Sequence, residues 1–266
     1  MVDRFGRRIT HLRISVTDRC NLRCRYCVPP DGVKLLPRQE ILSFDEIVGV
    51  AKAAVGLGVT KLRLTGGEPL VRRSVRQLVE QLAAIDGVED LAMTTNGTLL
   101  PDHAADLASA GLRRVNVSLD TMRSDRYRDI TRGGDLGLVL RGIKAAEDAG
   151  LRPIKLNCVV KESSSEPDAR EVARFAKERG LEARFIRRMD FETGRFSPVE
   201  GGAGGDCGRC NRLRLSSDGM VRPCLFSDLG FSVRKLGAAD ALRQAIVAKP
   251  KAGERCSHNW IRGIGG

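Results

Sequence analysis

Three cysteines lie close together near the start of the chain, at Cys20, Cys24 and Cys27 in the stretch RISVTDRCNLRCRYC of residues 13–27. Clustered thiols either form disulfides or ligate metal ions. Disulfides are typical of small secreted domains, whereas this chain has 266 residues, is 42% hydrophobic and starts with the charged sequence MVDR. It has no apolar run of the roughly 20 residues that a membrane span needs. We therefore expect a soluble cytoplasmic protein whose reduced thiols bind metal.

The spacing C-x₃-C-x₂-C of this first cysteine set suits a four-iron cluster, because three ligands leave one iron open. Zinc held by three thiolates is the alternative, although zinc sites mostly combine one C-x₂₋₄-C pair with a second pair elsewhere. Tyr26 precedes the last cysteine, and the sequence Gly-Gly-Glu-Pro follows at residues 66–69. With these additions the pattern resembles the signature of radical S-adenosylmethionine (SAM) enzymes.

This resemblance implies that the open iron binds the amino and carboxylate groups of SAM, which is then cleaved to a 5′-deoxyadenosyl radical. The backbone of Gly66 and Gly67 would come close to the ligand, and Glu68 would accept a hydrogen bond from its ammonium group. Taken alone, this sequence is an ordinary turn, and polar residues at strand ends also cap helices. The expected cofactor-binding residues are Tyr26, Gly66, Gly67, Glu68, Thr95, Asn96, Ser118, Asp120 and Met189.

Apolar runs alternate with helix-like stretches over the first 190 residues, which indicates βα units. Ser43 and Glu46 have capping-box spacing, as do Ser74 and Gln77, so each pair predicts the start of a helix. Predicted helices end near Gly58, Ile85, Gly111, Gly150 and Gly180. The predicted strands are His11–Val16, Lys61–Thr65, Asp90–Thr94, Arg114–Ser118, Ile154–Val160 and Ala183–Arg187.

Six such strands could form an open doubly wound sheet or a partial (βα)₆ barrel, and periodicity alone does not separate these folds. The polar motifs follow four successive strands, and barrels place their active sites at the carboxyl ends of their strands. We therefore expect an α/β fold with a partial (βα)₆ TIM-like barrel over residues 1–190. A glycine-rich linker over 191–205 would lead to a C-terminal cysteine-cluster region over 206–266 that closes the barrel mouth.

A second cysteine set, Cys207, Cys210 and Cys224, lies in the stretch CGRCNRLRLSSDGMVRPC. By itself, C-x₂-C with a later cysteine is more typical of structural zinc. The setting also includes the opening FGRRITHLRISVTDRCNLRCRYC, the sequence NRLR at 211–214 and the final Gly265-Gly266. Together these features resemble the MoaA family, the GTP 3′,8-cyclases of molybdenum cofactor biosynthesis, over most of residues 5–190 and 206–266.

The family resemblance implies two [4Fe-4S] clusters, the second of which binds the guanine of GTP through its open iron. The radical would abstract the ribose 3′ hydrogen, and GTP would become (8S)-3′,8-cyclo-7,8-dihydroguanosine 5′-triphosphate, in the first step of that pathway. A flavodoxin- or ferredoxin-type protein would donate electrons, a downstream cofactor-synthesis enzyme would take the product, and the chain could form a homodimer. The expected catalytic residues are Arg212, Arg214 and the terminal Gly265 and Gly266, which would enter the active site.

The net charge of +12 suits nucleic acid, a membrane surface or a small polyanion. Nucleic-acid binders usually carry stacking aromatics, but aromatics are 4% of this chain and Trp260 is its single tryptophan. We expect a small polyanion, with no nucleic acid or membrane as partner. A triphosphate carries about four negative charges, which arginine forks and lysines neutralise. By resemblance, the residues of its pocket are Arg13, Lys61, Arg63, Lys155, Arg184, Arg212 and Arg214.

The chain also departs from the family pattern. The segment DFETGRFSPVEGGAGGD before Cys207 is shorter than the family usually carries, and Arg187-Arg188 stands where the family tends to have an acidic residue. Cys256 could close the second cluster as a fourth ligand, although we expect a bystander, and Cys158 is expected to be a core residue. Two alternatives stay open: a radical SAM enzyme acting on another nucleotide or a peptide, and a basic zinc-binding module that contacts RNA.

Overall fold

One curved sheet organises the chain in the computed structural model, which describes residues 1–190, 196–253 and 256. Its strands are β1 (His11–Ser15), β2 (Lys61–Thr65), β3 (Asp90–Thr95), β4 (Arg114–Ser118), β5 (Lys155–Val160), β6 (Glu182–Arg187), β7 (Arg212–Leu215), β8 (Met220–Arg222) and β9 (Phe231–Ser232). In this described part the nine strands follow the order β6-β5-β4-β3-β2-β1-β7-β8-β9. Neighbours from β6 to β7 run parallel, and β8 and β9 continue antiparallel.

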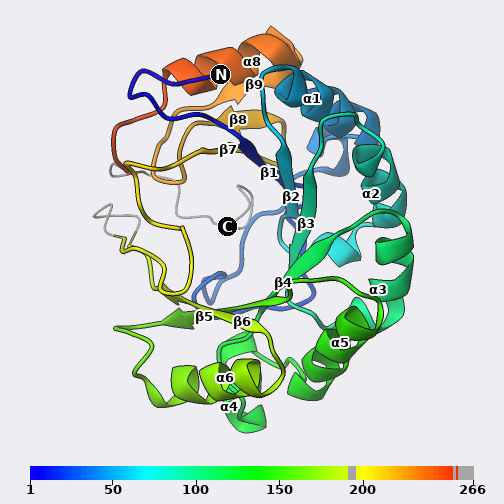
Figure 1. Cartoon of the computed structure of the whole chain (residues 1–266), viewed down its shortest axis with the longest axis vertical. Coiled ribbons are helices and arrows are strands. Elements are labelled where there is room, and N and C mark those ends of the chain that lie inside the picture. The colour runs from blue at the N-terminus through cyan, green and yellow to red at the C-terminus, as the bar shows by residue number, and fades with distance from the viewer. Residues whose placement is uncertain (191–195, 254–255, 257–266) are drawn as a thin grey trace.

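The helices cover the outer side of this sheet (Figure 1). They are α1 (Phe44–Gly56), α2 (Val75–Ala83), α3 (Leu100–Ser109), α4 (Ser124–Thr131), α5 (Leu136–Asp148), α6 (Pro167–Glu178), α7 (Val233–Leu236) and α8 (Ala238–Val247), with short 3₁₀ helices η1 (Arg38–Glu40) and η2 (Pro69–Val71). The sheet bends into an arc whose end strands, β6 and β9, are not paired with each other. The fold is therefore the expected partial barrel. No helix in the described residues combines the length and apolarity needed to cross a bilayer.

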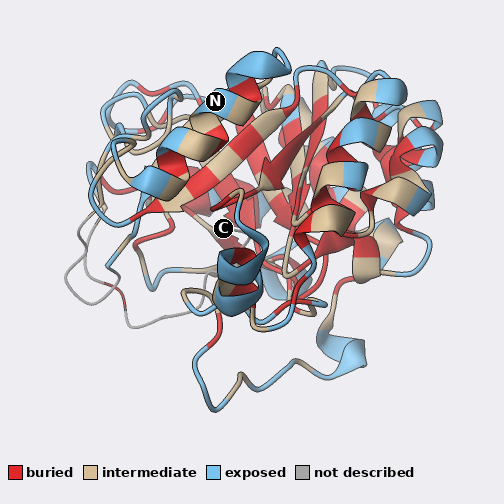
Figure 2. Ribbon diagram, turned by 90° about the horizontal axis from the view of Figure 1, so that it is seen from below, coloured by how far each residue is buried: buried red, intermediate tan, exposed pale blue. Residues whose placement is uncertain are grey.

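The hydrophobic core lies between the sheet and the helices. Alternate strand residues such as Leu12 and Ile14 on β1, and Leu62 and Leu64 on β2, are completely or almost completely buried in it. Figure 2 shows buried strands beneath helices that expose only their outer faces. Because successive side chains of a strand point to opposite faces, the residues between these apolar positions must face the inside of the arc.

The C-terminal region, which we expected to close the barrel mouth, adds its strands to the sheet beside β1. β7 pairs with β1 in parallel, with Arg212 opposite His11 and Arg214 opposite Arg13. This pairing also confirms that Arg212 and Arg214 lie on one strand and share a face. Residues from the two ends of the sequence are thus neighbours in the centre of the sheet.

Two local predictions were wrong. The single helix expected between the fourth and fifth strands is two helices, α4 and α5, because Arg132 takes a left-handed conformation (φ 54°) and Gly133 follows it with φ 116°. Ser74 does not cap α2: it is left-handed as well, and its side chain makes no capping hydrogen bond. The capping box of Ser43 and Glu46 at α1 is confirmed.

Candidate active site

A row of basic side chains crosses the inner face of the sheet. Arg13 lies between Arg63 on β2 and Arg214 on β7 in the strand register, and Arg214 in turn lies opposite Arg222 on β8. We call these four residues the arginine row. Further basic residues alternate with core positions in the same way and share this face: His11, Lys61, Arg114, Lys155, Arg184 and Arg212.

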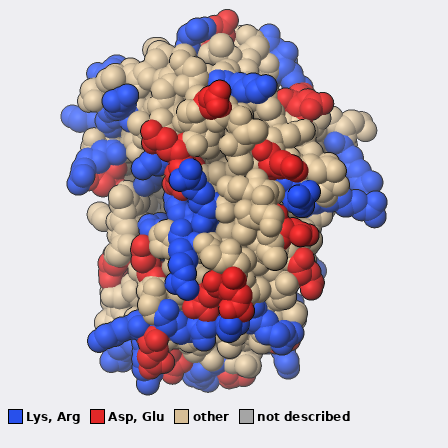
Figure 3. Space-filling model, turned by 45° about the vertical axis from the view of Figure 1, so that its right-hand side comes forward, with Lys and Arg blue, Asp and Glu red and all other residues tan. Residues whose placement is uncertain are grey.

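The many basic side chains on this face make the interior strongly electropositive, and burial and mutual repulsion lower their pKa values. Burial, together with the nearby charges of Arg114, Arg184 and Arg212, lowers the pKa of Arg63 to about 9. Burial also lowers the pKa of Arg214 to about 10, and Arg212 contributes to that shift. On the face of the outer surface that Figure 3 shows, by contrast, basic and acidic side chains are interspersed. The interior, rather than the surface, is therefore where a polyanion gains most.

Some of the interior basic groups already have acidic partners. Arg114 donates to both carboxylate oxygens of Asp90, and Glu182 pairs with Lys155 and, at 3.9 Å, with Arg184. Other guanidinium nitrogens are buried without a hydrogen-bond partner among the described residues, namely Nε of Arg63 and of Arg184, and Nε and Nη1 of Arg222. Donors buried in this way are costly unless a ligand accepts from them.

Sequence reasoning missed several interior residues. Arg114, Arg222 and His11 belong to the basic face, and Asn116 is fully buried with both polar side-chain atoms lacking a partner in the described structure. Asn116 lies opposite Thr94 on β3, whose hydroxyl also lacks a partner there. Alternation along Arg114–Ser118 could have identified Arg114 and Asn116 as interior residues. Val115 and Val117 are core positions, so the residues between them face the inside of the arc.

The first cysteine set occupies the loop that follows β1. The amides of Cys27 and Val28 both donate to the carbonyl of Cys24 at 2.9 Å, which turns the chain tightly. The Leu22 amide and the Asn96 side-chain amide donate to Sγ of Cys20 at 3.4 and 3.8 Å. Burial, the carboxylate of Asp120 and the other two thiols together raise the pKa of Cys24 to about 12. The three sulfurs therefore lie near one another.

Tyr26 and Asp120, two expected cofactor ligands, contact each other. The Tyr26 hydroxyl donates to Oδ2 of Asp120, and the Val159 amide donates to Oδ1, both at 2.8 Å. Burial raises the pKa of Asp120 to about 6. The pair links the cysteine loop to the carboxyl ends of β4 and β5, so these side chains support the loop.

Glu68, Thr95 and Asn96 are brought together where β2 and β3 end. The buried Glu68 carboxylate accepts hydrogen bonds from the Thr95 hydroxyl at 2.7 Å, the Asn96 amide at 2.6 Å and the Leu70 amide at 3.1 Å. Burial outweighs these bonds and raises its pKa to about 7. Glu68 is thus a carboxyl group that changes charge near neutral pH.

Gly66 and Gly67 lie directly against the backbone that leads into the cysteine loop. The Gly67 amide donates to the Thr17 carbonyl, and the Glu68 amide donates to the Arg19 carbonyl, both at 2.8 Å. A Cβ at Gly67 would lie 2.1 Å from the Arg19 carbonyl oxygen, and one at Gly66 would lie 2.5 Å from that of Thr17. The two glycines allow this close packing of backbone on backbone.

Replacing Gly67 with alanine should therefore destabilise the protein by about 2 kcal/mol or more, because the added methyl group collides with backbone that cannot rotate away. Urea unfolding of the metal-free protein measures the change. Gly49→Ala is the matched control: Gly49 is exposed within α1 with nothing within 4 Å of an added Cβ, and should gain about 0.5–1 kcal/mol. Equal stabilities for the two variants would contradict the packing role of Gly67.

The second cysteine set flanks β7. The Cys210 amide donates to the Cys207 carbonyl at 3.3 Å, and Cys210 is one of the groups that act on the pKa of Cys224. Cys256 is buried, and its Sγ lies 3.9 Å from the Leu225 carbonyl oxygen, next to this set. The expectation that Cys256 is a bystander stays a prediction. Cys158 is a core residue, as expected.

The two cysteine sets lie at opposite ends of the same strand pair. Cys20 follows the carboxyl end of β1, whereas Cys210 lies two residues before the amino end of the parallel β7. The amides of Thr10 and His11 both donate to the Asn211 carbonyl at 3.1 Å, which holds this second end together. The arginine row crosses the sheet between the two sets.

The thiols of each cysteine set influence one another electrostatically. In the first set the other two thiols contribute to the raised pKa of Cys24, and in the second set Cys210 acts on the pKa of Cys224. Within the residues that the structure describes, no three His, Cys, Asp or Glu side chains gather closely enough to hold one metal ion. Three thiolates per set are the ligand type and number that a four-iron cluster with one open iron would use.

The remaining predicted site residues have varied surroundings. Lys61 is exposed at the start of β2, and Ser118 ends β4 opposite Asn157. Met189 packs against the buried pair Leu225 and Phe226. Gly265 and Gly266 lie outside the described residues, so their expected entry into the active site stays a prediction.

Comparison with known proteins places these features in a family context. The model of the radical SAM superfamily matches residues 14–176. A GTP 3′,8-cyclase of Geobacter sulfurreducens is 42% identical over an alignment of 303 residues that covers 94% of this chain and 93% of the relative. A GTP 3′,8-cyclase of Moorella thermoacetica is 41% identical, with 99% and 96% covered. The alignments are longer than the 266-residue chain, so these relatives contain stretches without a counterpart here.

Solved structures support the fold. The structure described as native anSMEcpe with bound AdoMet has a TM-score of 0.63 at 17% identity, covering 91% of this chain and 82% of that one. Methylornithine synthase has a TM-score of 0.57 at 16% identity, with 70% and 55% covered. At such low identities the similarity concerns the partial barrel alone.

Proposed function

The chain belongs to the radical SAM superfamily and, within it, to the GTP 3′,8-cyclase family, and on that premise we propose that it converts GTP to (8S)-3′,8-cyclo-7,8-dihydroguanosine 5′-triphosphate. This reaction belongs to the biosynthesis of the molybdenum cofactor. The enzyme is a radical SAM lyase with [4Fe-4S] clusters and SAM as cofactors.

The observation that carries this proposal is the arginine row between the two cysteine sets. A triphosphate brings about four negative charges, and the buried guanidinium groups supply donors in a region of low dielectric constant, where each charge contact is strong. With its phosphates on Arg13, Arg63 and Arg214, a nucleotide would extend its base toward one end of β1 and β7. The ribose would then lie inside the arc, away from bulk water.

The chain's own cysteines would hold the two clusters: Cys20, Cys24 and Cys27 hold the first, and Cys207, Cys210 and Cys224 the second. When bound, the first cluster and SAM supply a 5′-deoxyadenosyl radical that takes the ribose 3′ hydrogen. Glu68 would orient SAM by accepting from its ammonium group, and Tyr26 and Asp120 keep the cysteine loop in position. The arginines hold the ribose and base in fixed relation, so that ring closure can compete with side reactions.

The site supports a nucleotide substrate over a peptide or a zinc-bound RNA contact, and the ATP control described below separates GTP from another nucleotide. A peptide-modifying radical SAM enzyme would have no use for a buried arginine row, since a peptide carries no comparable negative charge. A zinc-binding module would have no use for Gly66, Gly67 and Glu68, which pack against the backbone leading into the first cysteine set.

The proposed reaction also requires partners. We propose a flavodoxin- or ferredoxin-type electron donor, because cleavage of SAM consumes an electron, and a downstream cofactor-synthesis enzyme that takes the cyclised nucleotide. We propose a homodimer as the assembly, which sedimentation of the reconstituted protein would test.

GTP deuterated at the ribose 3′ carbon tests the reaction directly. Anaerobically reconstituted protein with SAM, reductant and this GTP should yield deuterated 5′-deoxyadenosine together with a cyclised nucleotide, both measured by mass spectrometry. Parallel reactions with ATP and without nucleotide serve as controls. Unlabelled 5′-deoxyadenosine and unchanged GTP would instead favour an enzyme that acts on another substrate.

SAM binding should depend on pH through Glu68. Because the pKa of Glu68 is about 7, its carboxylate is mostly charged at pH 8 and mostly protonated at pH 6. A protonated carboxyl group attracts an ammonium group poorly, so SAM should bind about tenfold more weakly at pH 6 than at pH 8. The Glu68→Gln protein cannot make this charge contact with the ammonium group at either pH, so its affinity for SAM should lack the pH dependence that comes from Glu68. Calorimetric titration of both proteins measures the ratio of their affinities, and the same ratio at both pH values would contradict the role of Glu68.

A further inference from the structure

A buried lysine lies next to the second cysteine set. Lys249 follows α8 and is only 2% exposed. Its Nζ donates to the carbonyl oxygens of Arg212 and Pro223, both at 2.7 Å. Arg212 is two residues after Cys210, and Pro223 immediately precedes Cys224. One ammonium group therefore joins the backbone segments that present two of the three cysteines.

The same ammonium group acts on the thiols themselves. Burial opposes ionisation of Cys210, but the charge of Lys249 and a hydrogen bond with it help to lower the pKa of that thiol. The charge of Lys249 also favours the thiolate of Cys224, although burial raises the pKa of Cys224 overall. A lysine is rarely buried unless its charge is compensated. Here burial lowers the pKa of Lys249, while Cys210 and Cys224 act in the opposite direction and favour its charged form.

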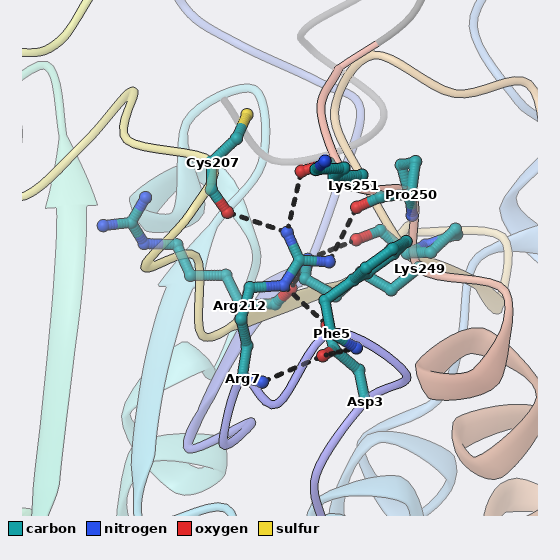
Figure 4. A network of polar contacts seen from close by, with 9 residues as sticks. Asp3, Phe5, Arg7, Cys207, Arg212, Lys249, Pro250 and Lys251 are labelled. Carbon is teal, nitrogen blue, oxygen red and sulfur yellow. Dashed lines mark hydrogen bonds and ion pairs between the residues drawn. The ribbon is translucent and has the colours of Figure 1, made fainter.

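The chain beyond Lys249 is fixed from the opposite side by Arg7 (Figure 4). The Arg7 guanidinium donates to the carbonyls of Pro250 at 2.6 Å, of Lys251 at 3.1 Å and of Cys207 at 2.7 Å. The Asp3 carboxylate accepts a hydrogen bond from Nε of Arg7 at 2.7 Å and holds the guanidinium group in place. Directly or through Arg7, segment 249–251 thereby connects to both backbone segments that carry the second cysteine set.

We propose that Lys249 is a positioning residue for the second cluster, and that its positive charge makes this cluster easier to reduce. The inference rests on the second four-iron cluster of the proposed function. Two carbonyl bonds hold β7 and the Pro223–Cys224 turn at the separation that the cluster needs. The reduction potential of an iron–sulfur cluster rises with nearby positive charge and with hydrogen bonds to its sulfurs, and Lys249 offers both.

Two substitutions separate positioning from charge. Lys249→Gln keeps amide donors for the carbonyls but removes the charge, whereas Lys249→Met removes both. Lys251→Gln is the matched control, because Lys251 lies two residues away with an exposed side chain. Each is made in the full-length chain with Cys20, Cys24 and Cys27 changed to alanine, so that only the second cluster is titrated. Iron per chain and the midpoint potential, followed by electron paramagnetic resonance, are the measurements.

Lys249→Gln should bind as much iron as the parent protein. Its reduction equilibrium should shift at least tenfold toward the oxidised cluster, which lowers the midpoint potential by about 59 mV for one electron. Lys249→Met should bind less than half the iron, and Lys251→Gln should match the parent. An unchanged potential in iron-loaded Lys249→Gln protein would overturn the charge role. Full iron binding by Lys249→Met would overturn the positioning role.

If the neutral variants Lys249→Gln and Lys249→Met do not fold, the Lys249→Arg variant still tests the role of the charge. It retains the charge, so its cluster should keep the parent potential even where the bulkier side chain reduces iron binding. A tenfold shift in Lys249→Arg protein would overturn the proposal. None of these measurements uses GTP. If the proposed cyclase reaction fails, the midpoint potential and the iron content are unaffected, so the two proposals can fail independently.

Discussion

Replacing Cys24 with alanine should abolish formation of 5′-deoxyadenosine, by about a thousandfold or more. Cys24 is the central member of the first cysteine set, and its carbonyl accepts the two amides that shape the loop. Without its thiolate the proposed first cluster would lack one of its three protein ligands, and SAM would no longer be cleaved reductively. Chromatographic detection of 5′-deoxyadenosine under strong reductant, with and without GTP, measures the loss.

Cys210→Ala is the matched variant for this experiment, because it removes one thiol from the second set at the opposite end of β1 and β7. It should lose cyclised product while retaining some SAM cleavage that is uncoupled from GTP. Complete loss of cleavage in both variants would show that the two cysteine sets do not divide the chemistry in this way.

Replacing Arg214 with alanine should lower productive cyclisation of GTP by about a hundredfold or more. Arg214 is 8% exposed and lies at the centre of the arginine row. Removing a buried charged partner costs roughly 2–5 kcal/mol of binding, which corresponds to this loss. In the proposed site SAM is cleaved at the other end of the strands, so SAM cleavage should fall far less. The ratio of cyclised nucleotide to 5′-deoxyadenosine, measured in one reaction, reports the difference.

Arg243→Ala provides the control for charge alone. Arg243 is an exposed residue of α8 that pairs with Asp240, so its removal lowers the net charge by the same amount without touching the interior. It should leave the product ratio unchanged. If both variants lowered the ratio equally, long-range attraction by net charge, and not the arginine row, would be the source of GTP binding.

The sequence predicted the barrel strands well because their signals are local. The predicted Lys61–Thr65 and Arg114–Ser118 coincide with β2 and β4. Each is a short run with buried apolar residues at every second position. The division between α4 and α5 was missed although Gly133-Gly134 marked it, since the helical pattern on both sides outweighed the break.

The candidate site was only partly predictable. Motif spacing identified both cysteine sets and Glu68, whose partners lie nearby at strand ends. The arginine row depends on strand register, which joins Arg13 to Arg214 across two hundred residues of sequence. Nothing in one sequence distinguishes Arg222 of that row from an exposed arginine. The hydrogen bond between Tyr26 and Asp120 was also missed, because the sequence analysis interpreted both residues as cofactor ligands and not as partners of each other.

The parallel register of β1 and β7 has a consequence for the size of the substrate. The five residues of β1, at about 3.3 Å each, extend about 17 Å from the end beside Cys210 to the end that leads to Cys20. In the proposed complex, the strand pair therefore limits the length of the substrate: the nucleotide must be long enough to place its base at the first end while its ribose stays within range of the second. A slip of one residue would alter this length by about 3.3 Å and turn Arg214 toward the helices. The pairing of β1 and β7 thus determines the length of substrate that the site accepts. Insertions in the outer loops can leave this length unchanged.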